Sequence, residues 1–208
     1  MKRQNHEEVY TSSARSSPRG KRLLSWLLSM VMLLSLLPGM ELTTREEAHM
    51  LCYFRTVQAC MAFGEAIYAH LAPTPNNERF FGRQQVMNER DEEIDVEERL
   101  LIGALDLPFE VCAARIREAG GLCVPAHINR GSSGVLGALG FLPQGVHYDA
   151  LEVSPAAPLT ADVTGYRLLR SSDAHSLEQM LEREFALEAK TRSVDAVFDA
   201  IAGRTQPD

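Results

Sequence analysis

Residues 38–54, PGMELTTREEAHMLCYF, decide how the fold of this chain is interpreted. A polar segment carrying Glu41 and His49 runs into MLCYF, an apolar run that predicts a buried β-strand. In α/β proteins, polar side chains near the ends of buried strands often build the functional site. Glu41 is equally explained as one more charge in an acidic stretch, and His49 as a residue that faces solvent.

Two later stretches end in the same kinds of residue. LCVPAH predicts a short strand that ends at His127, and YRLLRSSDAHS changes from an apolar run to Asp173 and His175. If the strands are parallel, their carboxyl ends share one edge, and we expect these side chains to converge there. Carboxylates combined with imidazoles suit zinc, manganese or iron. Taken alone, Asp173 is also a good helix cap, and His127 a hydrogen-bonded, partly buried histidine.

The segments between these stretches predict an α/β fold. Helical periodicity runs from Val57 to Pro73, from Pro108 to Gly120, and from the candidate cap Ser193 onward. YDALEVS predicts a further strand, and the alternation favours parallel strands. For the first of these helices, the predicted inward face is Val57, Met61, Ala62, Ile67 and Leu71. For the second, it is Val111, Ala114, Ile116 and Ala119.

Composition sets the class of protein. The chain has 208 residues, 45% of them hydrophobic, which allows one domain with a substantial core. A net charge of −7 gives no strong signal for nucleic-acid binding. The cysteines form no CxxC motif, which favours buried thiols, a reducing compartment and a cytoplasmic location. They are Cys52, Cys60, Cys112 and Cys123.

The amino-terminal part has a different character. A basic, polar leader precedes residues 23–37, a run of fifteen residues without a charge. A membrane span needs about 20 residues, and no A-x-A cleavage site follows the run. Three interpretations stay open: an uncleaved membrane anchor, a buried core segment, or a leader foreign to the fold. Membrane association through residues 23–37 is not the favoured one.

Taken together, PGMELTTREEAHMLCYF, GGLCVPAHINR and RSSDAHS resemble, in this order, the PHP (polymerase and histidinol phosphatase) domain family. The resemblance is closest to the small phosphoesterase-like members and covers roughly residues 38–203. It implies a distorted (β/α)7 TIM-like barrel with a two- or three-metal site at the carboxyl ends of the strands. The metal ligands that it implies are Glu41, His49, His127, Asp173 and His175.

The chemistry implied by the resemblance is metal-dependent hydrolysis of a phosphate ester. Divalent manganese, zinc or iron ions would polarise the phosphoryl group, and the ligands would set geometry rather than attack the substrate. The expected partner is a small phosphorylated substrate, with nucleotides among the candidates. Arg130, three residues after His127, is a candidate phosphate contact because a guanidinium binds phosphate through two hydrogen bonds.

The sequence also departs from the family pattern. Family members open with an H-x-H strand, an aspartate and a T-D-H segment before the G-x-E motif that contains Glu41. This chain has no H-x-H, its only earlier histidine is His6, and its first aspartate is Asp91. We therefore expect an incomplete barrel that lacks the first metal-binding motifs. One hypothesis is that a shifted reading frame or a misassigned start replaced the native amino-terminal part.

These patterns divide the chain into two parts. Residues 1–37 form a leader outside the family pattern, and residues 38–208 a partial PHP domain with a charged insertion at about 73–99. The predicted function is an impaired metal-dependent phosphoesterase. The alternatives are a catalytically inactive remnant or regulatory module, and a membrane-tethered protein.

Overall fold

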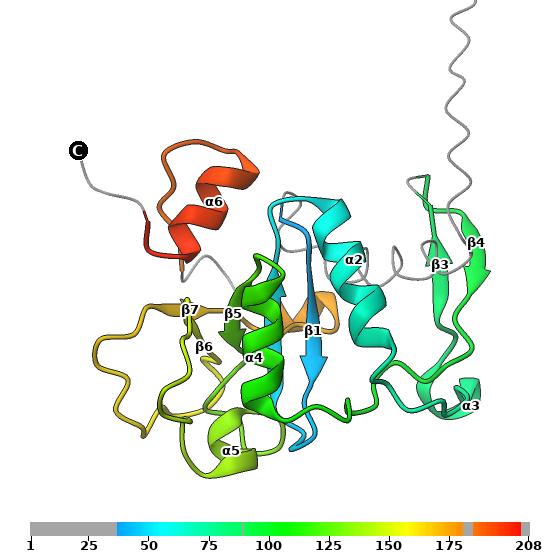
Figure 1. The fold of residues 1–208 in the computed structure, drawn as a ribbon, viewed down its shortest axis with the longest axis horizontal. Coiled ribbons are helices and arrows are strands. Elements are labelled where there is room, and N and C mark those ends of the chain that lie inside the picture. Colours follow the sequence, from blue (N-terminus) through cyan, green and yellow to red (C-terminus); the bar gives the residue numbers. More distant parts are fainter. Residues whose placement is uncertain (1–36, 89, 181–184, 205–208) are drawn as a thin grey trace, which may run out of the picture.

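The chain folds into a mixed α/β structure (Figure 1). The computed structural model describes residues 37–88, 90–180 and 185–204. The strands are β1 (Gly39–Thr43), β2 (His49–Tyr53), β3 (Gln85–Met87), β4 (Glu93–Val96), β5 (Leu122–Pro125), β6 (Leu151–Val153) and β7 (Leu168–Arg170). The helices are α2 (Val57–Tyr68), α3 (Glu78–Phe81), α4 (Phe109–Glu118), α5 (Val135–Leu139), the 3-10 helix η1 (Leu177–Gln179) and α6 (Val194–Ile201).

A three-stranded sheet with the order β1-β2-β5 forms the centre of the fold. Both of its pairings are antiparallel, with Thr43 opposite His49 and Cys52 opposite Cys123. The expectation of parallel strands is wrong for this sheet. The turn of residues 44–48 is too short for the crossover that parallel neighbours need, so β1 and β2 form a hairpin.

Parallel pairing occurs between β6 and β7, where Leu151 lies opposite Leu168. Within the described ranges the strands form three small sheets, and none of these closes into a barrel. The α/β class is therefore confirmed, whereas a (β/α)7 barrel stays a prediction.

Side-chain alternation along β2 gives the sheet two apolar faces. Met50 and Cys52 belong to the cluster that α2 and α4 cover. Leu51 and Tyr53 belong to a second cluster, to which α6 contributes Phe198 and Ile201. Figure 1 shows α4 in front of β5, α2 on the other side of β1, and α6 apart from both helices. The sheet is thus buried between helices.

The helices confirm the prediction only in part. α2 buries Cys60, Phe63, Gly64 and Ile67, and α4 buries Phe109, Cys112, Ala113 and Ile116. Five residues that we expected inside are exposed: Val57, Ala62, Val111, Ala114 and Ala119. Burying a phenylalanine ring removes more apolar surface from water than burying a valine side chain. The face of each helix that carries its phenylalanine therefore packs against the core. In α6 the predicted cap is confirmed, because the Ser193 hydroxyl accepts the Ala196 N–H.

Residues 73–99 form α3 and the β3–β4 hairpin, which lie to one side of the domain beyond α2 (Figure 1). Most side chains here are exposed, and Val86 and Glu97 are buried. Arg83 Nη2 donates to Glu93 Oε1 at 2.6 Å and ties the segment after α3 to β4. The segment therefore has little core of its own.

All four cysteines are free and buried, which confirms the prediction made for Cys52 and Cys123. Burial raises the pKa of Cys60, of Cys112 and of Cys123 to about 12, so these thiols are protonated near neutral pH.

In the described part of the chain, no helix has the length and apolar character needed to cross a membrane. Of the predicted apolar run 23–37, residues 23–36 lie outside the part of the chain that the structure describes. Leu37, its last residue, is buried in the second cluster.

The packing beneath α2 predicts that removing the ring of one phenylalanine, Phe54, strongly destabilises the fold. Phe54 is fully buried, with its ring centroid 5.1 Å from that of Phe63. Phe54→Ala is expected to lower the free energy of unfolding by about 3–5 kcal/mol. The control Phe80→Ala removes a ring that is 79% exposed and should change it by less than about 0.5 kcal/mol. Urea denaturation measures both, and equal losses would contradict this description of the core.

Candidate metal centre

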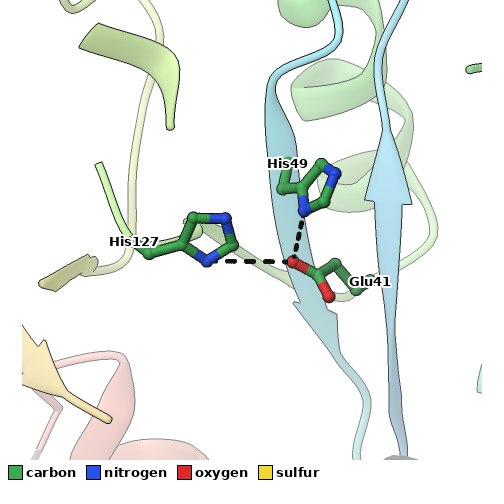
Figure 2. Close-up of side chains that lie close together, drawn as sticks. All are labelled: Glu41, His49 and His127. Atoms are coloured by element: carbon green, nitrogen blue, oxygen red, sulfur yellow. Dashed lines mark hydrogen bonds and ion pairs between the residues drawn. The ribbon is translucent and has the colours of Figure 1, made fainter. Parts of the chain in front are cut away.

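Three of the predicted ligands lie together at one end of the central sheet. Glu41, His49 and His127 each offer a ligand atom, and these atoms lie within 4.8 Å of one another. Glu41 Oε1 is 3.0 Å from His49 Nδ1 and 4.0 Å from His127 Nδ1. Figure 2 shows both imidazoles pointing their Nδ1 atoms at this carboxylate oxygen. The two rings meet edge to face, with centroids 5.2 Å apart.

The antiparallel sheet brings the first two of these residues together. Thr43 on β1 lies opposite His49 on β2, so both side chains project from the same face. Glu41, two residues before Thr43, shares that face because side chains alternate along a strand. The start of β2 therefore lies beside the end of β1. We expected parallel strands to bring Glu41 and His49 together, and an antiparallel hairpin does so instead.

His127 reaches the cluster through an unusual backbone conformation. β5 ends at Pro125, and His127 has a φ of 27°, in the left-handed region that residues other than glycine rarely adopt. Such strain persists only where the surroundings hold it. The His127 N–H donates to Glu152 Oε2 at 2.9 Å, and the His127 carbonyl accepts the Arg130 N–H at 2.8 Å. A Cβ at Gly134 would lie 2.5 Å from that carbonyl oxygen, so this position requires glycine.

Glu152 is a site residue that the sequence reasoning missed. It lies on β6, is 7% exposed, and its Oε2 is 3.5 Å from His127 Nδ1. Its other oxygen accepts a hydrogen bond from the Ser171 hydroxyl. Burial raises the pKa of Glu152, but its contacts with His127 and Ser171 outweigh burial, so the pKa lies below the ordinary value. A single carboxylate inside the apolar run ALEVS was the available signal.

Asp173 lies near the cluster but is held by Arg130. Arg130 Nη1 donates to Asp173 Oδ2, and both side chains influence the pKa of His49. Asp173, with a φ of 49°, is a second strained residue after a strand. The alternative of a helix cap does not describe it, because η1 begins after Ser176 and its first turn has no side-chain cap.

His175 is not brought into the cluster. Its side chain is 77% exposed, and its Nδ1 lies 2.8 Å from the backbone oxygen of Asp173. The structure therefore assembles Glu41, His49 and His127 and leaves His175 at the surface.

The charges around His49 favour a cation between these side chains. The hydrogen bond that His49 donates to Glu41 raises the pKa of His49, burial lowers it, and the charge of Asp173 raises it again. Arg130 has a smaller, opposite effect, and the net result is a pKa above the ordinary value of 6.5. A proton on His49 thus satisfies a negative environment that a metal ion would also satisfy.

The donor set fits a divalent metal. Imidazole nitrogens and a carboxylate oxygen are the ligands of zinc, manganese and iron sites. Ligand atoms about 2.0–2.2 Å from a common tetrahedral ion are roughly 3.4 Å apart, and the distances of 3.0 and 4.0 Å from Glu41 Oε1 to the imidazoles bracket this spacing. Glu41, His49 and His127 are therefore positioned to hold such an ion.

Comparison with known proteins supports the fold. No family model matches the chain, and no curated protein matches it. The crystal structure of a lesion-specific endonuclease, PfuEndoQ from Pyrococcus furiosus, is similar, with a TM-score of 0.54 and 21% identity. The match covers 79% of this chain and 38% of the endonuclease chain, so this chain spans well under half of that length. This likeness supports a fold shared with the matched part of the endonuclease.

The contact between Glu41 and His49 predicts a change in titration. Glu41→Gln removes the charge that raises the pKa of His49, and we expect this pKa to fall because burial still lowers it. Nuclear magnetic resonance titration of the metal-free protein measures it, with exposed His147 as the internal reference.

The raised pKa of His49 also determines how the stability of the fold changes with pH. The stability that the pair contributes is fully present below the ordinary value of 6.5 and is lost as pH rises through the raised folded pKa. Glu41→Gln should therefore reduce stability most at acidic pH. An unchanged pKa of His49 in this variant would show that Glu41 does not control its protonation.

Proposed function

We propose that this chain hydrolyses phosphate esters with a divalent metal held by Glu41, His49 and His127. The observation that carries the proposal is the convergence of these donors within 4.8 Å. Glu152 accepts the backbone N–H of His127 and so holds in place the residue that carries this imidazole.

The charges around the cluster also support a metal. Glu41 and Glu152 both lie beside His127, and Asp173 is paired with the guanidinium of Arg130. A phosphate would be repelled by such a site unless a bound cation reversed its sign.

When bound, a divalent cation supplies Lewis-acid activation of the phosphoryl group and of water. The residues of the chain have supporting roles. Glu41 and the two histidines orient the ion, and Arg130 donates to phosphate oxygens. The cysteines are buried and their thiols have raised pKa values, so a thiolate is a poor candidate for the nucleophile. Water is therefore the proposed nucleophile.

The proposed substrate class is a nucleotidic phosphate ester. The similar solved structure is that of a lesion-specific endonuclease, which motivates testing nucleic-acid strands beside free nucleotides. The net charge of −7 argues against extended contacts with a nucleic-acid backbone. We therefore propose that contacts near the scissile phosphate dominate binding, with a small phosphorylated substrate as the simplest form.

A second candidate is a module that binds metal without turnover. His175 lies at the surface, and the carboxylate of Asp173 is paired with Arg130. If both stay away from the metal, three protein ligands remain. This arrangement favours a single ion, whereas the resemblance implies a site for two or three.

Removal of one ligand tests the proposal. His127→Ala should reduce bound Mn²⁺ or Zn²⁺ and phosphoesterase activity together, because the remaining donors hold the ion weakly. The matched control is His147→Ala, which removes a histidine that is 56% exposed. Metal analysis and hydrolysis of nucleotides, oligonucleotides and an aryl phosphate provide the measurements. Unchanged metal content in His127→Ala would reject the ligand assignment, and metal binding without hydrolysis in the unmodified chain would favour the second candidate.

The role of Arg130 is tested by its effect on substrate binding. Arg130→Ala should lower kcat/KM about 10- to 100-fold, mainly through KM, because a charged hydrogen bond to phosphate is worth about 1.5–3 kcal/mol. Arg130→Lys should lose less, since it keeps the charge. Arg170→Ala, an exposed position on β7, is the control. An unchanged KM in Arg130→Ala would show that Arg130 does not contact the substrate phosphate.

A further inference from the structure

Ser133 contacts both histidines of the cluster. It lies in the glycine-containing loop between β5 and α5, six residues after His127. Its carbonyl oxygen accepts the backbone N–H of His49 at 2.8 Å. Its hydroxyl Oγ lies 2.9 Å from His127 Nε2. One residue thus joins the start of β2 to the imidazole that follows β5.

The contacts of His127 distinguish its two ring nitrogens. Nε2 lies within normal hydrogen-bond distance of Ser133 Oγ. Nδ1 is 3.5 Å from Glu152 Oε2 and 4.0 Å from Glu41 Oε1, both too long for a good hydrogen bond. Glu152 Oε2 also already accepts the backbone N–H of His127. A neutral imidazole carries one N–H, and Nε2 is where that proton has a well-placed acceptor.

We propose that Ser133 is the positioning residue that fixes the tautomer of His127. Its hydroxyl accepts the Nε2–H, which leaves the Nδ1 lone pair directed at Glu41 as the metal-binding atom. Histidine ligands generally donate their second ring N–H to an oxygen acceptor, which fixes the ring and its tautomer. The inference rests on the proposed metal site and assigns the ligand atom within it.

The loop backbone is built to hold this serine in place. Gly134 packs so closely that a Cβ there would lie 2.5 Å from the His127 oxygen and 2.7 Å from the Arg130 oxygen. The loop therefore folds back on the residues that follow His127. Ser132, by contrast, is exposed and provides a matched control.

The first measurement is nitrogen-15 nuclear magnetic resonance of the histidines in the metal-free protein. At a pH of about 8, where an ordinary histidine is neutral, His127 should carry its proton on Nε2. Ser133→Ala should give a mixture of tautomers, and Ser133→Thr should restore the Nε2–H form. A proton on Nδ1 in the unmodified chain, or an unchanged tautomer in Ser133→Ala, overturns the proposal.

The second measurement is calorimetric titration with Zn²⁺. Ser133→Ala should bind Zn²⁺ about tenfold more weakly, and Ser133→Thr and Ser132→Ala should stay near the unmodified value. Equal weakening in Ser133→Ala and Ser132→Ala would indicate a general effect of the loop and overturn the assignment. Thermal unfolding followed by circular dichroism checks that the variants are folded.

The two measurements separate this inference from the function on which it rests. Absence of Zn²⁺ binding in the unmodified chain would contradict the proposed metal site. The tautomer in the metal-free protein would still decide whether Ser133 orients the ring of His127.

Discussion

The hydrogen bond from the backbone N–H of His127 to Glu152 supports most of the site. Glu152 is buried on β6. One of its oxygens accepts the backbone N–H of His127, after β5, and the other accepts the hydroxyl of Ser171, after β7. One carboxylate therefore holds two neighbouring chain segments against its own strand. Replacing it would leave buried donors unsatisfied and would release His127 from its left-handed conformation. The histidine ring reaches Glu41 only while this backbone is held.

The local patterns of the sequence located β2, β5, β6, β7, α2, α4 and α6, whereas β1, the β3–β4 hairpin, α3 and α5 were not predicted. The apolar runs became β2 and β5, and the polar residues flanking them, Glu41, His49 and His127, came together. Strand direction was not recoverable from apolar alternation, since that pattern defines faces and not neighbours. The short segment between Thr43 and His49 was the readable signal for a hairpin, because no parallel crossover fits there.

Two other differences have physical causes that the sequence only hints at. The inward faces of α2 and α4 follow the phenylalanines Phe63 and Phe109, whose burial removes more apolar surface than that of a valine. Asp173 and His175 are two residues apart, and we expected them to act together. The positive φ of Asp173 interrupts the extended course of the chain, so the carboxylate pairs with Arg130 and His175 stays at the surface. Backbone turns of this kind depend on contacts distant in the sequence.

The excess of carboxylates links metal binding and phosphate binding in one argument. A proton on His49 offsets part of the negative charge of the nearby carboxylates, because Glu41 and Asp173 raise the pKa of this histidine. In the proposed function, a cation bound there would neutralise carboxylates that otherwise repel phosphate, and a phosphate bound to Arg130 would compete with Asp173 for the guanidinium. Release of Asp173 adds a free carboxylate beside the cation. Metal and phosphate are thus expected to strengthen each other's binding by the same factor, because linkage between two sites is reciprocal.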